Sequence, residues 1–99
     1  MGGKKMAGYV IGHITIKDPN QWMEYRAKVP PTLAKWGGEL ILRGRMVAVL
    51  NGEHPYTDTV VIRFPDADAA AGWYASAAYQ SLIPLREKAA KMVLISYVG

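Results

Sequence analysis

The chain has 99 residues, a net charge of +4, a hydrophobic fraction of 51% and no cysteine. This length fits one domain, and the lack of cysteine excludes disulfides, thiolate metal sites and a cysteine nucleophile. No apolar run approaches the roughly 18 residues of a membrane span. No stretch has the charged, apolar and small-residue order of a signal peptide. We therefore expect a cytoplasmic protein with no membrane partner.

Residues 1–7 form a Gly-rich head that contains Lys4 and Lys5. We expect this head to be disordered or an addition to the domain, which would then comprise residues 8–99. The remaining Lys and Arg residues are scattered along the chain. Nucleic-acid binding needs a basic stripe or a known motif, so we expect no nucleic-acid partner.

The first half of the chain predicts a strand and a broken helix. Residues 9–16 are rich in β-branched side chains and predict a strand. Asp18 suits a helix N-cap and Pro19 the first helical position. An apolar stripe at spacings of three and four follows: Trp22, Tyr25, Val29, Leu33 and Trp36. Pro30 and Pro31 interrupt this stripe, so we predict two helical pieces that meet at a kink.

The second half predicts two strands, a run of short helices and a last strand. Residues 39–50 predict a long strand with a bulge or bend at Gly44, and residues 57–64 predict the next strand. Asp66 suits the positive end of the following helix. Ser76 suits the N-cap of a further short helix, and another turn begins at Pro84. Residues 92–98 predict the final strand.

The predicted order is βαββαβ, which indicates an α+β, ferredoxin-like domain with two helices on one face of a four-stranded antiparallel sheet. The first strand is apolar on both of its faces, which indicates that both faces are covered. Only one face has helices to cover it. We therefore expect the other face to meet a second copy of the chain in a homodimer.

A series of short motifs is similar to domain-of-unknown-function family 1330 across about residues 8–98. These motifs are Asp18-Pro19, Tyr25-Arg26, Val29-Pro30, Gly37-Gly38, Leu42-Arg43-Gly44, Phe64-Pro65-Asp66, Trp73-Tyr74, and Ser76 and Tyr79 through Leu82 to Arg86. The resemblance implies a dimeric α/β barrel of ferredoxin-like subunits and no settled activity. The wider superfamily includes cofactor-free monooxygenases, small isomerases and haem-binding enzymes. The chain departs from the family pattern at the second proline, Pro31, and at Arg45.

His13 is the candidate catalytic residue, because a histidine can act as general acid or base near neutral pH. The alternative is a histidine of the core or interface with hydrogen-bonded ring nitrogens. His54 lies in a loop between Glu53 and Pro55, and two histidines alone make a weak metal site. We therefore predict no metal site and assign no cofactor.

The candidate ligand-binding residues carry hydroxyl or guanidinium groups: Tyr25, Arg43, Tyr74, Ser76, Tyr79 and Arg86. Arginine suits the two-pronged binding of a carboxylate or phosphate, and the alternative for each arginine is an ordinary ion pair. The tyrosines can orient a ligand or belong to the core, and Ser76 can serve as a cap alone.

We expect His13 and the five tyrosine and arginine residues to cluster at one cavity between sheet and helices. This pattern favours a protein that binds a small anionic or aromatic organic molecule. A cofactor-free monooxygenase or isomerase is the enzymatic form of that hypothesis. The alternative is a non-catalytic dimeric module with a structural or interaction role.

Overall fold

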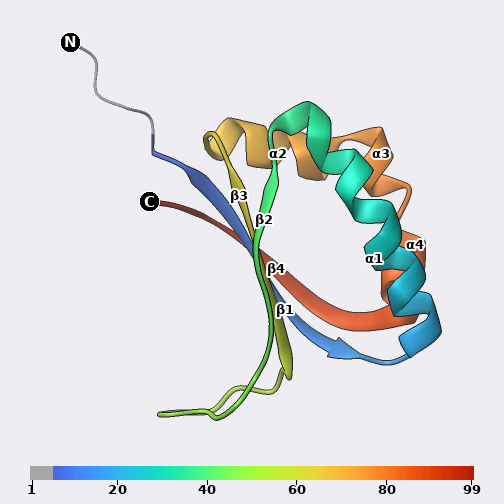
Figure 1. Ribbon diagram of the computed structural model, residues 1–99, viewed down its shortest axis with the longest axis vertical. Coiled ribbons are helices and arrows are strands. Elements are labelled where there is room, and N and C mark those ends of the chain that lie inside the picture. Colours follow the sequence, from blue (N-terminus) through green and yellow to red (C-terminus); the bar gives the residue numbers. More distant parts are fainter. Residues whose placement is uncertain (1–5) are drawn as a thin grey trace.

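The computed structural model describes residues 6–99, which fold as one antiparallel sheet covered on one face by helices (Figure 1). The sheet has four strands in the order β2-β3-β1-β4. The elements are β1 (Gly8–Ile16), α1 (Pro19–Leu33), the 3₁₀ helix η1 (Ala34–Trp36), β2 (Glu39–Arg45), β3 (Asp58–Phe64), α2 (Ala67–Ala75), α3 (Ala77–Gln80), α4 (Ile83–Ala89) and β4 (Ala90–Val98). The predicted α+β, ferredoxin-like fold with a four-stranded antiparallel sheet is confirmed.

The amino-terminal head lies mostly outside the described residues, which begin at Met6. Ala7 is buried, and its carbonyl accepts a hydrogen bond from the amide of Gly99 at 3.1 Å. Ala7 therefore packs with the domain, and the rest of the predicted head stays a prediction.

Helix α1 begins as predicted but does not break at its prolines. The Asp18 carboxylate accepts hydrogen bonds from the amides of Asn20 and Gln21, at 3.0 and 3.1 Å, and caps the helix. The helix then continues through Pro30 and Pro31, so the predicted division into two pieces at that pair is wrong, and the predicted kink stays a prediction. The prolines remove two N–H donors, but Trp22, Tyr25 and Leu33 of the helix stay buried. The change of geometry comes later, where η1 begins.

Strand β2 is shorter than predicted, and its irregularity lies elsewhere. It ends at Arg45, and its register shifts between Leu40 and Leu42. Gly44 pairs regularly with Thr59, so the predicted bulge at Gly44 is wrong. A bulge needs one extra residue on one strand, and here that residue is Ile41.

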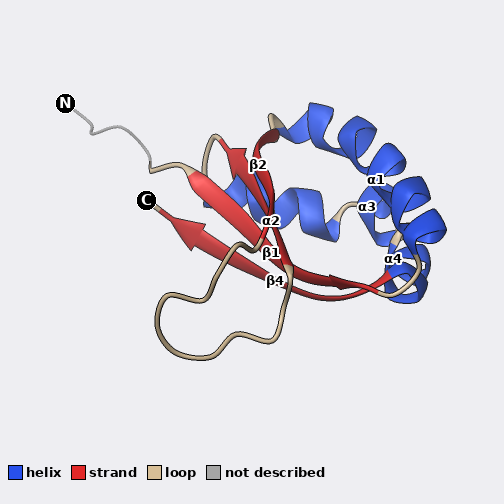
Figure 2. Ribbon diagram, turned by 60° about the horizontal axis from the view of Figure 1, so that its bottom comes forward, coloured by secondary structure: helices blue, strands red, loops and turns tan. Residues whose placement is uncertain are grey.

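A long loop over residues 46–57 joins β2 to β3 (Figure 2). Backbone hydrogen bonds hold both of its ends: the amide of Met46 donates to the carbonyl of Thr57 at 2.7 Å, and the amide of Thr57 donates to the carbonyl of Ile14 at 3.0 Å. The side chains of Val47 and Leu50 are 99% and 97% exposed. The loop therefore leaves the sheet from a fixed base.

The core lies between the helices and one face of the sheet. Its largest fully buried side chains are Trp73, Tyr79, Phe64 and Ile14. Close helix packing is possible because Gly72 has no side chain: a Cβ there would lie 2.4 Å from the ring of Trp36. No helix within residues 6–99 is both long and apolar enough to cross a membrane.

Candidate functional site

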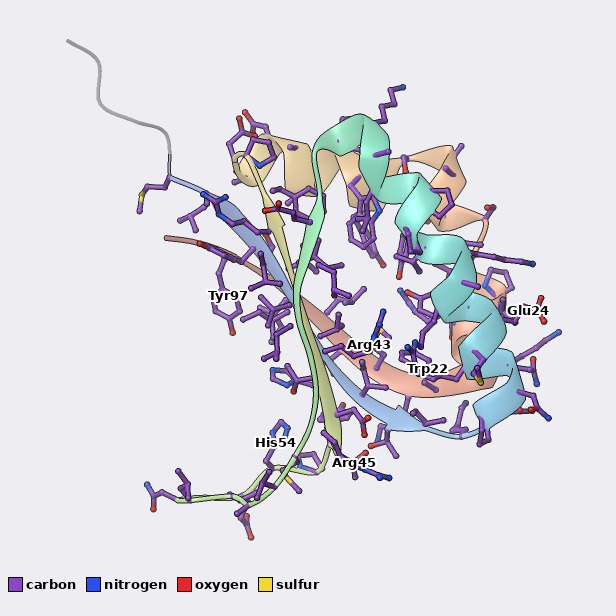
Figure 3. The ribbon with its side chains drawn as sticks, in the orientation of Figure 1. Trp22, Glu24, Arg43, Arg45, His54 and Tyr97 are labelled. Carbon is purple, nitrogen blue, oxygen red and sulfur yellow. The ribbon has the colours of Figure 1, made fainter. Side chains whose placement is uncertain are left out.

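The bulge in β2 directs Arg43 towards the helices. Side chains alternate between the faces of a strand, so Leu40 and Leu42 would share a face in a regular strand. The extra residue places Leu40 and Arg43 on the same face instead, and Arg43 pairs with Val60 on the helix side. Figure 3 shows Arg43 and Trp22 on this side of the sheet.

Arg43 lies at a small cavity between sheet and helices, which we call the helix–sheet cavity. Its volume is about 150 Å³. It is mostly apolar, with two arginines, and is lined by Ile14, Ile16, Trp22, Tyr25, Arg26, Val29, Pro30, Leu33, Leu40, Arg43, Asp58, Thr59, Val60, Ile62, Trp73, Met92 and Leu94. An apolar wall with few charged groups suits a small organic ligand.

Two positive charges face this cavity without a paired carboxylate. Partial burial, and then the charge of Arg26, lower the pKa of Arg43. Within residues 6–99, neither arginine takes part in an ion pair. Asp58 also lines the cavity, but its carboxylate accepts a hydrogen bond from the hydroxyl of Thr57 at 2.7 Å. The two guanidinium groups therefore repel each other, and with Asp58 the cavity lining carries one more positive than negative charge.

Behind the cavity, two tyrosines and an arginine form a connected cluster. The hydroxyl oxygens of Tyr25 and Tyr79 lie 2.8 Å apart, and Nη1 of Arg86 donates to the Tyr79 hydroxyl at 3.0 Å. Burial, and then the charge of Tyr79, raise the pKa of Tyr25 well above its usual range. Tyr25 therefore stays protonated and acts as a hydrogen-bonding group rather than a base.

The same cluster holds the charge on Arg86. Burial lowers the pKa of Arg86, but its hydrogen bond to Tyr79, with further contributions from Tyr74 and Tyr25, outweighs that effect and raises the pKa. Arg86 makes no ion pair with a carboxylate within the described part of the chain. Arg86 is therefore a third arginine without a paired carboxylate among the described residues.

Arg86 and Tyr74 line a second, wider cavity, which we call the β4-edge cavity. Its volume is about 480 Å³. It lies between α2, α4 and β4, and its lining residues are Val10, Ala70, Ala71, Tyr74, Arg86, Met92, Leu94, Ile95 and Ser96. The expected single cavity is thus wrong: Tyr25 and Arg43 line one cavity, Tyr74 and Arg86 line another, and Tyr79 is fully buried.

His13 lies on the opposite face of the sheet. Its ring is 5.0 Å from the ring of His54 and 6.2 Å from that of Tyr56. Its Nδ1 is buried without a hydrogen-bond partner among the described residues. Figure 3 shows His54 and Tyr97 on this side, away from the helices. His13 therefore reaches neither cavity, and its candidate catalytic role stays a prediction.

Ser76 uses its hydroxyl within the fold. The hydroxyl donates to the carbonyl of Trp73 at 2.6 Å and accepts from the amide of Tyr79 at 3.2 Å. It caps α3, which confirms the predicted N-cap. A hydroxyl with both of these partners is poorly placed to bind a ligand, and the ligand-binding role of Ser76 stays a prediction.

Sequence reasoning missed Arg26 and Trp22 as lining residues. Trp22 was assigned to the core by its spacing, and Arg26 was treated as part of a motif only. The signal was present, because Arg26 lies one helical turn after Trp22 and so shares its face. Within residues 6–99, no three His, Cys, Asp or Glu side chains gather closely enough to hold a metal ion.

Solved structures with this fold support the architecture. A protein of unknown function from Rhodopseudomonas palustris is 13% identical, with a TM-score of 0.79 over 97% of this chain and 84% of that chain. SnoaB, a cofactor-independent oxygenase from Streptomyces nogalater, is 11% identical, with a TM-score of 0.66 over 95% and 93%. A dimeric ferredoxin-like protein of unknown function from Thermobifida fusca is 12% identical, with a TM-score of 0.67 over 100% and 96%. At these identities the likeness shows the fold alone.

Among curated protein sequences, none matches this chain. A family model matches almost all of the folded domain. It covers residues 7–98 and is described as a domain of unknown function, DUF1330. The chain therefore belongs to the DUF1330 family.

Proposed function

We propose that this protein is a homodimer that binds a small organic anion in the helix–sheet cavity. The observation that carries this proposal is the pair of guanidinium groups, Arg26 and Arg43, at one small apolar cavity without a paired carboxylate. The anionic group of the ligand binds between the two arginines. Its apolar part lies against Trp22, Val60 and Leu94.

The charges favour an anion over a neutral ligand. Arginine stays charged in proteins, so Arg26 and Arg43 outnumber the single carboxylate of Asp58 in the lining and attract a negative group. A carboxylate matches the planar guanidinium with two parallel hydrogen bonds. Because Arg43 remains exposed at the cavity mouth, solvent screens this attraction, and we expect a moderate rather than a large contribution to affinity.

The open face of the sheet supports the homodimer. Leu42, Val93, Ile95 and Tyr97 are exposed by 52%, 38%, 37% and 46%. Contiguous apolar surface of this kind marks an interaction site. A second copy of the same face would cover it with twofold symmetry, and one structure of similar fold is described as dimeric. A cytoplasmic location is part of the same proposal and is testable by cell fractionation.

Binding of aromatic and aliphatic monocarboxylates, measured by calorimetry and by NMR titration, tests the ligand proposal. We expect the wild type to bind at least one of them and Arg43→Ala to weaken that binding about tenfold, within the range of a charged hydrogen bond. Arg45→Ala is the matched control, because Arg45 is an exposed arginine of the same strand that does not line the cavity. The proposal fails if no carboxylate binds, or if both variants bind as the wild type does.

Two enzymatic forms of the proposal and one non-catalytic alternative can also be tested. The shared fold of SnoaB suggests a cofactor-free oxygenase, and an isomerase is a second enzymatic form of the proposal. The protein is incubated with each carboxylate that it binds, in the presence of dissolved oxygen. Mass spectrometry would then detect an oxygenated product, and chromatography would separate an isomer of the carboxylate. A non-catalytic dimeric module is the alternative, and the charged cavity favours ligand binding over it.

A further inference from the structure

A straight row of residues crosses the helix side of the sheet from Arg43. Arg43 on β2 pairs with Val60 on β3, Val60 pairs with Gly12 on β1, and Gly12 pairs with Leu94 on β4. Neighbouring strands lie about 4.8 Å apart, so this row extends about 14 Å. It begins at the helix–sheet cavity and ends at the β4-edge cavity, because Leu94 lines both.

Gly12, in the middle of this row, places no side chain between Val60 and Leu94. A Cβ at Gly12 would lie 2.9 Å from Cγ1 of Val60 and 3.1 Å from Cδ2 of Leu94. Because that Cβ is absent, the side chains of Val60 and Leu94 can lie close to the backbone of β1. The sheet surface between the two cavities, formed by Val60, Gly12 and Leu94, is therefore apolar.

Met92 separates the two cavities and is suited to move. It lines the helix–sheet cavity, the β4-edge cavity and a third cavity beside Arg86. Methionine is unbranched and has three rotatable bonds, so it adapts readily to a changing shape. The two cavities therefore meet at two shared side chains, Met92 and Leu94, of which Met92 is the more adaptable.

The two ends of this row carry the same kind of group. Arg26 and Arg43 lie at one end, and Arg86 with the Tyr74 ring at the other. Arg86 donates one hydrogen bond to Tyr79, and a guanidinium has five N–H donors. Donors of Arg86 therefore remain for a ligand in the β4-edge cavity.

We propose that the two cavities are the ends of one elongated site, which binds an organic dianion with an apolar middle. One carboxylate lies at Arg43 and Arg26, the other at Arg86 and Tyr74, and the apolar chain between them crosses Met92 and Leu94. This inference rests on the proposed function, since it assigns the anion of the helix–sheet cavity a second charged end.

A series of unbranched dicarboxylates from four to twelve carbons, each compared with the monocarboxylate of equal length, tests the proposal by calorimetry. We expect one chain length to bind at least tenfold more tightly as the dicarboxylate. Arg86→Gln should remove this advantage, so that the dicarboxylate binds the variant no more tightly than the monocarboxylate of equal length. If Arg86→Gln keeps the advantage, or if no dicarboxylate exceeds its monocarboxylate, the elongated site is overturned.

A second measurement on the wild type is needed because Arg86 also supports Tyr79, and Arg86→Gln could unfold the chain. In NMR titration, the dicarboxylate should shift the side-chain N–H signals of both Arg43 and Arg86, whereas the monocarboxylate should shift that of Arg43 and not that of Arg86. Shifts at Arg43 alone with both ligands would overturn the elongated site and leave the proposed function intact. No shift at Arg43 with either ligand would contradict the proposed function itself.

Discussion

The two faces of the sheet come from the same strands but differ in what covers them. On the helix side, Ile14 and Phe64 are each 1% exposed. On the open side, Ile95 and Tyr97 of β4 are 37% and 46% exposed, although they are just as apolar. Figure 1 shows the helices gathered on one side of the sheet.

This difference shows that the sequence of a strand does not by itself decide which side is buried. Burial of apolar surface contributes about 25 cal/mol for each Å², so the helix side supplies the stability of the single chain. The apolar side chains of the open side would also be stabilised by burial, but in an isolated chain they stay exposed to water. The first face therefore determines folding, and the second has the composition of a surface for assembly.

The largest expected effect is on the helix side. Trp73→Ala should lower the free energy of unfolding by about 3–5 kcal/mol. Trp73 is 1% exposed, its ring packs 4.3 Å from that of Tyr79, and its Nε1 donates to the hydroxyl of Thr32. Urea denaturation followed by circular dichroism measures this change. Met23→Ala is the control, because Met23 is 66% exposed and should change stability by no more than roughly 0.5 kcal/mol.

The next effect is on the open side and concerns assembly rather than folding. The wild type should scatter light with twice the subunit mass of 10.9 kDa. Ile95→Lys should weaken dimerisation at least tenfold, which corresponds to about 1.4 kcal/mol, because the twofold axis brings two new charges to one apolar interface. A wild type that is monomeric at micromolar concentration would contradict this prediction. The circular dichroism spectrum of Ile95→Lys should remain that of the wild type.

The smallest expected effect is the pH dependence of the stability that is linked to Tyr25 on the helix side. The raised pKa of Tyr25 means that above about pH 10, the usual tyrosine value, the unfolded chain loses a proton that the folded chain keeps. The stability linked to Tyr25 is therefore complete below pH 10 and is lost as the pH rises towards the folded pKa. The slope is at most about 1.4 kcal/mol for each pH unit.

Urea denaturation between pH 9 and 11 measures this slope. Tyr25→Phe should show a shallower loss of stability than the wild type. Equal slopes in the wild type and Tyr25→Phe would show that Tyr25 ionises as readily in the folded chain as in the unfolded one.

Most of the fold was predictable because local signals agree with it. The Asp18 cap and the Ser76 cap both form as their residue types indicate. The errors came where tertiary contacts override local preference. Pro30 and Pro31 are helix breakers by their chemistry, yet buried Trp22 and Leu33 hold the helix on both sides of the pair.

The candidate site was harder to predict than the fold. Arg43 was identified by residue type, but its direction depends on the bulge at Ile41, and Gly44 is the residue whose type suggests a bulge. His13 was expected at the cavity or, alternatively, in the core or interface, and it lies on the open face of the sheet, beside His54. An apolar strand with two covered faces gives no sign of which face meets the helices. The position of His13 beside His54 depends on a contact with a loop residue that is far from His13 in the sequence.

The loop over residues 46–57 bears on how members of this family can diverge. Its base is tied to the sheet by Met46, Thr57 and Ile14, while Val47 and Leu50 pack against almost nothing within the described chain. Insertions in such a loop cost little, because closure entropy grows slowly with length. Natural variants should therefore gain or lose residues here far more often than in α2, where Gly72 admits no other side chain beside Trp36.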